Sequence, residues 1–270
     1  MPQTKKKIGL ALGSGGVRGL AHIGVIKELK KNNIPIDFIS GASAGALVGA
    51  FYAAHLDVDG LEKIALDTNW QTAFSIFDPT WHGGLLKGKK IENLIKQWLL
   101  NIDFPGLKIP LAVVATDLKS GKEIDIKQGN VIKAVRASLA VPPVFQPIEA
   151  NGYLLSDGGL SNPLPAAVVR QMGADIVIAV NLENGQFDSD INFLNHLSLT
   201  KISIRALNII RYYLAKNSLQ YADIAIEPKV AEVGLVGWNR IFDNNQVTAI
   251  IKEGELAVAK KITEIKKICQ

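Results

Sequence analysis

The sequence predicts an α/β protein whose central sheet is mostly parallel. Short runs of apolar residues, typical of strands buried on both faces, alternate with longer segments of helical periodicity. Within the first 55 residues, the order strand, small-residue turn, helix occurs twice. Parallel strands need such crossovers, so we expect helices to cover both faces of the sheet.

The two strand–turn–helix units justify this fold class at the N-terminal end. In the first unit, an apolar strand at residues 8–12 leads into a glycine-rich turn at 13–19 and a helix with an apolar face at 20–31. The second unit repeats this order, with its strand, turn and helix at residues 36–39, 41–45 and 46–55.

Later elements continue the pattern, and a hairpin turn is predicted at Asn151-Gly152. Further strands are expected at residues 111–115, 123–126, 153–155, 176–181 and 224–226. Further helices are expected at residues 61–66, 91–100, 131–139, 165–172, 208–221 and 247–268. Because no linker rich in Pro, Gly or Ser divides the chain, we predict one domain over residues 1–270, with a core of about 8–230 and a C-terminal helical segment of about 231–270.

The composition favours a globular protein and argues against a nucleic-acid partner. Hydrophobic residues make up 48% of the chain and charged residues 20%, which is enough apolar material for a sizeable core. The 30 Lys and Arg exceed the 25 Asp and Glu, for a net charge of +5. This mild excess favours an anionic membrane surface, although a solvated basic surface is the commoner reason for it. Nucleic-acid binders show clustered basic residues with interleaved aromatics, which this chain lacks.

Cysteine and histidine usage predicts neither a disulfide nor a metal site. Cys269 is the single cysteine, and the four histidines have no i, i+4 pair among them. The first seven residues are polar and basic, and the weakly polar stretch at 42–54 is too short and glycine-rich to span a bilayer. We therefore expect a cytoplasmic protein without a cofactor, and peripheral contact with the inner membrane face stays open.

The pentapeptide at residues 41–45, Gly-Ala-Ser-Ala-Gly, has the form G-x-S-x-G. A serine on a sharp turn from strand to helix holds its hydroxyl above the sheet, and the flanking glycines remove Cβ atoms that would clash there. The following helix N-terminus favours developing negative charge. The alternative is a small-residue turn that only lets the helix pack closely. The strand before and the helix after favour Ser43 as a nucleophile.

The glycine-rich turn at residues 13–19 can direct several backbone N–H groups into one concavity, which suits a phosphate or an oxyanion. The competing interpretation is a dinucleotide-binding loop, with Asp37 as the acid that binds the ribose. Two features weaken it. After Gly13 and Gly15 the third glycine is off spacing, because Arg18 occupies that place, and Asp37 precedes its strand.

A third turn, Asp157-Gly158-Gly159, follows a predicted strand. Such an Asp usually caps a turn or helix, and its place at a strand end makes it a candidate base. Of the histidines only His196 follows it, in a polar stretch, and His22 is expected to support the glycine loop. A free Asp is a weak base at neutral pH, but a dry site would raise its pKa.

These three motifs, in this order and spacing, resemble those of patatin-like phospholipases, particularly the short bacterial members. The resemblance includes the run Ala-Ser-Leu-Ala-Val-Pro at 137–142, Phe145, Pro147 and Asn162-Pro163. It extends from about residue 8 to 251 and is weakest over 57–110 and 182–200.

The resemblance implies a three-layer α/β/α fold and a Ser–Asp dyad that cleaves phospholipids, lysophospholipids or other acyl esters. Ser43 would attack the ester carbonyl, and Asp157 would take its proton and later activate water. The amides expected to hold the oxyanion are those of Gly15, Gly16, Val17 and Arg18. The motif glycines are Gly13, Gly19, Gly41, Gly45, Gly158 and Gly159. Ser14 departs from the family, where glycine is frequent, but it still supplies a backbone N–H.

Two alternatives stay open for the function. A non-lipid carboxylesterase or thioesterase would use the same dyad, and a non-catalytic nucleotide-binding or regulatory module would not. The segment at 70–90, with four aromatic residues and three lysines, could be a lid that touches lipid or an ordinary cap. The C-terminal helix could pack on the domain, pair with another chain or touch a membrane, and packing is the default.

Overall fold

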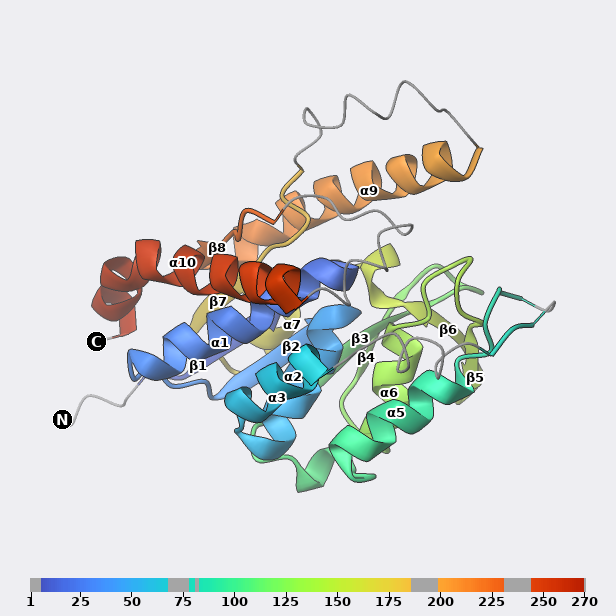
Figure 1. Cartoon of the computed structure of the whole chain (residues 1–270), viewed down its shortest axis with the longest axis horizontal. Helices are drawn as coiled ribbons and strands as arrows, with labels where there is room; N and C mark the ends of the chain where they lie inside the picture. Colours follow the sequence, from blue (N-terminus) through green and yellow to red (C-terminus); the bar gives the residue numbers. More distant parts are fainter. Residues whose placement is uncertain (1–5, 68–77, 81–82, 186–198, 231–243, 270) are drawn as a thin grey trace.

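The computed structural model describes residues 6–67, 78–80, 83–185, 199–230 and 244–269, and they form a sheet with helices on both faces (Figure 1). The sheet has the strand order β5-β6-β3-β2-β1-β7-β8, and β4 pairs with β3 as well. β1 lies near the middle, with β2 on one side and β7 on the other, so the turns that follow β1 and β2 are neighbours.

Parallel strands form the centre of the sheet and antiparallel strands form one edge. The parallel strands are β1 (Ile8–Leu12), β2 (Phe38–Ala42), β3 (Leu111–Asp117), β7 (Ile176–Val180) and β8 (Ile224–Ile226). The antiparallel strands are β4 (Glu123–Ile126), β5 (Ile148–Ala150) and β6 (Tyr153–Asp157). The α/β fold class with a mostly parallel sheet is therefore confirmed.

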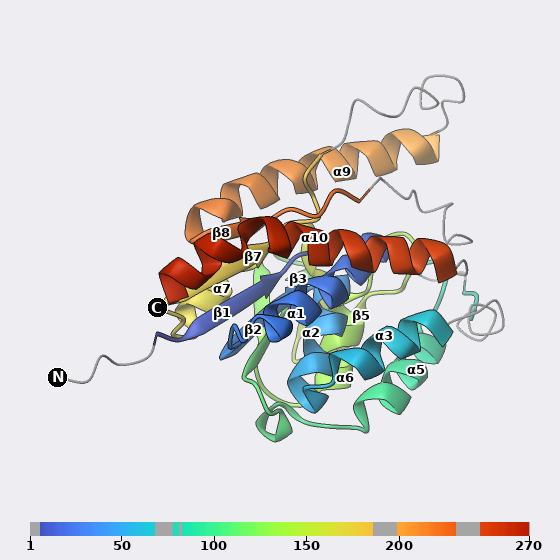
Figure 2. The same cartoon turned by 60° about the vertical axis from the view of Figure 1, so that its left-hand side comes forward.

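Helices cover the two faces of the sheet (Figure 2). One face carries α1 (Ala21–Lys31), α2 (Ala44–His55), α3 (Val58–Asp67), α5 (Lys89–Leu99), α6 (Val131–Ser138) and α10 (Asn244–Cys269). The other face carries α7 (Ala166–Gln171) and α9 (Leu199–Ser218). Among the described helices, none combines the length and the apolar character that crossing a membrane requires.

Side-chain size differs between the two faces of the sheet. In β1, Ile8, Leu10 and Leu12 point into the large core beneath α1, α2 and α10, whereas Ala11 points toward α7. Because successive side chains of a strand alternate between faces, this pattern packs bulky residues on one side and small residues on the other. The small residues let α7 lie close to the sheet.

Two predicted boundaries are wrong by several residues. β2 covers Phe38–Ala42 rather than 36–39, because Gly41 and Ala42 still pair with neighbouring strands although small residues favour strands weakly. α9 begins at Leu199 rather than at 208. Residues 201–205 alternate between polar and apolar types, a pattern that is typical of a strand over so short a stretch.

The C-terminal helix α10 packs on α1 through a close contact between backbones. A Cβ atom on Gly24 of α1 would overlap the carbonyl oxygen of Ile251, and one on Gly254 would overlap that of Ala21. Helices approach this closely only where a side chain is missing at the crossing. Of the three roles considered for the C-terminal helix, packing on the rest of the fold is the one that these described residues show.

Replacing Gly254 with valine should destabilise the protein, because its side chain has no room against α1. We expect a loss of about 1–3 kcal/mol in the free energy of unfolding, typical of overpacking. Ala259→Val is a matched control at an exposed position of the same helix. Thermal denaturation of both variants checks this, and equal melting temperatures would contradict the close crossing of α1 and α10.

Candidate active site

Ser43 lies at the turn between β2 and α2, in a backbone conformation that ordinary residues rarely adopt. Its φ is 53° and its ψ is −121°, and its side chain is buried. A left-handed φ at a residue other than glycine costs about 1–3 kcal/mol and is common at active sites. Gly45 makes the turn feasible, since a Cβ there would overlap the carbonyl oxygen of Leu12. The predicted sharp turn from strand to helix is therefore present, with Ser43 at its apex.

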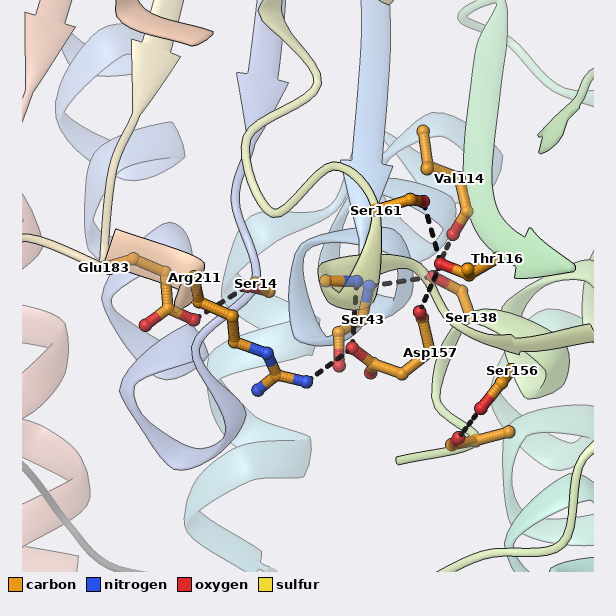
Figure 3. Close-up of polar contacts among 12 residues, drawn as sticks. Ser14, Ser43, Val114, Thr116, Ser138, Ser156, Asp157, Ser161, Glu183 and Arg211 are labelled. Carbon is orange, nitrogen blue, oxygen red and sulfur yellow. Dashed lines mark hydrogen bonds and ion pairs between the residues drawn. The ribbon is translucent and has the colours of Figure 1, made fainter. Parts of the chain in front are cut away.

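Ser138, at the end of α6, holds this turn in place (Figure 3). The backbone N–H of Ser43 donates to the Ser138 hydroxyl at 2.8 Å, and that hydroxyl donates to the carbonyl of Val114 at 2.6 Å. The hydroxyl thus links the turn to β3. The sequence placed Ser138 only within the family-like run at 137–142 and predicted no role for it. Nothing in its local sequence indicates a partner 95 residues away.

Asp157 is the last residue of β6 and is completely buried. Its main chain is fixed on both sides, because its N–H donates to the carbonyl of Ala140 at 3.1 Å and its C=O accepts from the Thr116 hydroxyl at 2.8 Å. Its Oδ1 accepts from the N–H of Gly159 at 2.9 Å, which is the expected cap. Figure 3 shows the Asp157 carboxylate beside the Ser43 hydroxyl, so the structure brings the two predicted residues together.

A second charged side chain, which was not predicted from the sequence, reaches this carboxylate from α9. The guanidinium of Arg211 donates to Oδ1 of Asp157 at 2.8 Å, and 11% of its side chain is exposed (Figure 3). Burial raises the pKa of the Asp157 carboxyl above its ordinary value, while Arg211 and then the Ser43 hydroxyl act to lower that pKa. Arg211 therefore helps to keep a buried carboxylate ionised.

This pair predicts a pH effect with a definite sign. In Arg211→Gln the cation is lost, the pKa of Asp157 rises further, and a base that must be ionised becomes active only at higher pH. The acidic limb of kcat/KM for a soluble ester should move to higher pH. Lys216→Gln removes an equal charge from the same helix at an exposed position and should leave the limb in place. An unmoved limb in Arg211→Gln would mean that it does not report Asp157.

The glycine loop after β1 leaves three consecutive backbone amides available. The N–H groups of Gly13 and Ser14 donate to the carbonyls of Val180 and Pro163, and that of Arg18 donates back to Gly15. In the described part of the chain, no loop hydrogen bond uses the N–H groups of Gly15, Gly16 or Val17. Gly16 has a φ of 56° and begins a 3-10 helix, whose first amides lack partners within it. The expected fourth donor, Arg18, is engaged within the turn.

Glu183 ties this loop to the segment after β7. Its carboxylate accepts from the Ser14 hydroxyl at 2.8 Å and from the guanidinium of Arg18 at 2.7 Å. Ser14 and Glu183 are both buried. The serine that departs from the family pattern therefore makes a specific contact, the hydrogen bond from its hydroxyl to Glu183. The sequence held no signal for Glu183, because its partners are 165 and 169 residues distant.

The residues behind the competing interpretations have structural partners. His22 is fully buried and its Nε2 lies 2.8 Å from the carbonyl oxygen of Gly13, so Nε2 carries the proton and supports the glycine loop. Burial lowers the pKa of His22 to about 4. Asp37 lies before β2 and its carboxylate accepts from the N–H of Ile8, at the edge of the sheet opposite the glycine loop. Within the described ranges, His, Cys, Asp and Glu form no group suited to a metal ion.

The segment suggested as a lid, residues 70–90, is described only at 78–80 and 83–90. Its four aromatic residues are among those not described, as are two of the histidines: Trp70, Phe74, Phe77, Trp81, His82 and His196. The described end of the segment is fastened to α6, because the buried guanidinium of Arg136 donates to the carbonyls of Lys87 and Gly88 at 2.8 and 3.0 Å. This part packs on the core as an ordinary cap would.

Comparisons with known proteins agree on the family. The family model described as Patatin-like phospholipase matches residues 10–170. An NTE family protein of Mycobacterium tuberculosis is 39% identical over 184 residues, which are 68% of this chain and 51% of that protein. The neuropathy target esterase sws of Drosophila melanogaster is 32% identical over 206 residues, covering 72% of this chain and 14% of that protein.

The same comparison extends to solved structures. The crystal structure of VipD from Legionella pneumophila resembles this chain with a TM-score of 0.55 at 15% identity, covering 96% of this chain and 67% of that one, which shows a shared fold. This chain matches about half the length of the mycobacterial relative (51%). On the match to the family model and the identity to these relatives, the chain belongs to the patatin-like phospholipase family.

Proposed function

We propose that this protein hydrolyses acyl esters of lipids with Ser43 as nucleophile and Asp157 as its base. One observation carries the proposal: a serine in a strained turn at a helix N-terminus lies beside a fully buried carboxylate. Nucleophile, base and oxyanion donors are the three parts that acyl transfer needs. The amides of Gly15 and its two successors supply the third part without a metal ion or cofactor.

In the acylation step, the Ser43 oxygen attacks the ester carbonyl while its proton passes to Asp157. The carbonyl oxygen becomes an oxyanion, which the amides of Gly15, Gly16 and Val17 stabilise. The tetrahedral intermediate then collapses, the bond to the alcohol breaks, and the leaving alcohol takes the proton from Asp157. Oδ2 of Asp157 suits this proton transfer, because within the described residues it accepts no hydrogen bond.

The deacylation step repeats this chemistry with water. Asp157 removes a proton from water, whose oxygen attacks the acyl carbonyl on Ser43, and the same three amides hold the second oxyanion. Collapse releases the carboxylic acid, and Ser43 regains its proton from Asp157. Burial favours both transfers, because it raises the pKa of the carboxyl and so makes the carboxylate a stronger base than a free one.

Lipid esters are the proposed substrate class because of the family. The matched family model is described as Patatin-like phospholipase, and the insect relative is named an esterase. A carboxylesterase or thioesterase for soluble substrates would use the same dyad. The two differ in how activity changes with acyl-chain length and with the presence of a phospholipid head group.

The test is a substrate panel combined with active-site labelling. The purified protein would be assayed on p-nitrophenyl esters of increasing chain length, on acyl thioesters, and on phospholipid and lysophospholipid. We expect turnover of p-nitrophenyl esters and of at least one lipid. A fluorophosphonate should add once per chain, and peptide mass mapping should locate it on Ser43. Hydrolysis of soluble esters alone would favour the carboxylesterase, and labelling elsewhere would exclude Ser43 as nucleophile.

The non-catalytic alternative makes the opposite predictions. A nucleotide-binding or regulatory module would bind NAD or a nucleotide tightly and would show neither ester turnover nor labelling. Calorimetric titration with NAD and ATP distinguishes the two. We expect no binding, because Arg18 takes the place of the third glycine of a dinucleotide-binding loop, and Asp37 lies at the opposite end of the strands, where it accepts from Ile8.

A further inference from the structure

Helix α9 exposes large apolar side chains along one face. Ile202, Ile209, Ile210 and Tyr213 have between 40% and 63% of their surface exposed. They stand at positions i, i+7, i+8 and i+11, which fall on one side of an α-helix. Four large apolar side chains exposed on one side of a helix are more than the single exposed residues that are normal on a soluble protein, so this face is a candidate interaction surface.

The charges of α9 indicate what this face contacts. The helix carries four basic residues and no acidic residue in its 20 positions. Among them, Lys216 is exposed and follows Tyr213 by three residues, so it lies beside the apolar side chains. The whole chain is also basic, with a net charge of +5. Isoleucine and tyrosine beside an exposed lysine, on a helix without acidic residues, suit the boundary of an anionic lipid surface.

The opposite face of α9 belongs to the active site. Arg211 and Ala215, one turn apart, point inward, where Arg211 binds Asp157 and Ala215 packs with residues of β1 and β7. Because Arg211 is on the opposite side of the helix from the four apolar side chains, the apolar face and the catalytic carboxylate lie on the two sides of α9. A surface that binds the outer face of α9 would be separated from the catalytic carboxylate by this one helix.

We infer that the outer face of α9, formed by Ile202, Ile209, Ile210 and Tyr213 with Lys216 beside it, docks the protein on an anionic lipid surface. The biological use of this docking rests on the proposed function, because docking would bring lipid substrate to the dyad. Binding to the lipid surface itself needs no catalysis. It differs from the lid suggested for residues 70–90, which lie on another part of the chain.

Vesicle co-sedimentation of the full chain tests this. Wild type should bind vesicles of phosphatidylcholine with phosphatidylglycerol at low salt and bind phosphatidylcholine alone weakly, and high salt should release it. Ile210→Ser/Tyr213→Ser should reduce the partition coefficient about tenfold or more, because two apolar anchors are lost. Lys216→Glu should weaken binding at least about fivefold, from one basic residue near the surface.

The matched control removes equally exposed apolar side chains elsewhere. Leu85→Ser/Leu100→Ser changes two leucines that are 61% and 76% exposed, and it should bind vesicles as wild type does. All three variants should hydrolyse soluble p-nitrophenyl butyrate within about twofold of wild type, since none changes the dyad or its donors. Hydrolysis of vesicle phospholipid should fall in parallel with binding.

Three kinds of result would overturn the inference, and a fourth would overturn only the proposed function. Equal binding by wild type and Ile210→Ser/Tyr213→Ser, or loss of binding only in the leucine control, would move docking to another surface. If sedimentation equilibrium shows that wild type is a dimer and that Ile210→Ser/Tyr213→Ser is a monomer, the face is a contact between copies of the chain. A melting temperature markedly lowered in the variant would mean that the chain itself covers the face. Vesicle binding without any ester turnover would keep the docking surface and reject the hydrolase.

Discussion

Ser43→Ala is expected to lower kcat for ester hydrolysis by about 10⁴-fold or more, because removal of a nucleophile leaves only the binding and oxyanion contributions. The variant should keep its fold, since the Ser43 hydroxyl takes no part in holding the turn. The contacts that hold it are the backbone N–H of Ser43 and the Ser138 hydroxyl, and both remain. Steady-state assays on p-nitrophenyl esters, with thermal denaturation of the same preparation, check both expectations.

Ser40→Ala provides the control for this variant. Ser40 lies on the same strand, is completely buried, and donates its hydroxyl to the carbonyl of Pro165 at 2.7 Å. Its loss should lower stability by about 1 kcal/mol and leave kcat within about twofold of wild type. Fluorophosphonate should label Ser40→Ala and fail to label Ser43→Ala. Labelling that persists in Ser43→Ala would remove Ser43 as the nucleophile.

The strained backbone at Ser43 gives a second measurement on the same position. Glycine tolerates a φ of 53° with a ψ of −121° better than alanine does. Ser43→Gly should therefore unfold at a higher temperature than Ser43→Ala, by about 1 kcal/mol in the free energy of unfolding, although both are inactive. Equal stability would mean that the turn is relaxed in solution.

The nucleophile and the glycine loop could be predicted because their signals are local. At Ser43, a strand, a small-residue turn and a helix follow one another within about 20 residues, and the structure has them in that order. The glycines are needed where backbones meet: a Cβ on Gly45 would overlap the carbonyl of Leu12, and one on Gly158 would overlap that of Val114. These steric requirements can be recognised in the sequence, because only glycine fits at these positions.

Asp157 was predicted mainly from the family resemblance, and the structure adds a physical reason. β6 runs antiparallel to β3, and Asp157 pairs with Ala115, so the strand end comes back to the edge of the sheet where Ser43 lies. The pairing of β3 with β6 is a tertiary event between segments about 40 residues apart. Periodicity identifies each strand but cannot give the partner or the direction.

Arg211, Ser138 and Glu183 could not be predicted, because each acts through a distant partner. The contacts join residues 54, 95 and 169 positions apart. An arginine on an amphipathic helix is normally solvated, so nothing in the local pattern distinguishes Arg211 from a surface residue. Its role follows only from the contact that its side chain makes with the end of β6. Alternation at 201–205 also hid the first turns of this helix, as described above.

Asp157→Asn is expected to lower kcat by about 10³-fold while the protein remains folded. Asparagine has nearly the same shape, and its Oδ1 can still accept from Gly159 and Arg211. A neutral amide cannot take the proton of Ser43, so the serine stays a weak nucleophile. The residual activity should also lose the acidic limb of its pH profile, because the group that titrates there is gone. Assays across pH and circular dichroism melting measure these effects.

Asp117→Asn separates loss of the base from loss of a buried carboxylate in general. Asp117 ends β3 as Asp157 ends β6, and it is buried and accepts from the Ser120 hydroxyl at 2.6 Å and the N–H of Leu154 at 2.9 Å. Those hydrogen bonds hold the pKa of Asp117 below its ordinary value, so the carboxylate stays charged and stabilises the turn after β3. Asp117→Asn should lower the melting temperature and spare kcat. Near-normal activity in Asp157→Asn would instead place the base elsewhere, with His22, neutral at pH 7, as the next residue to replace.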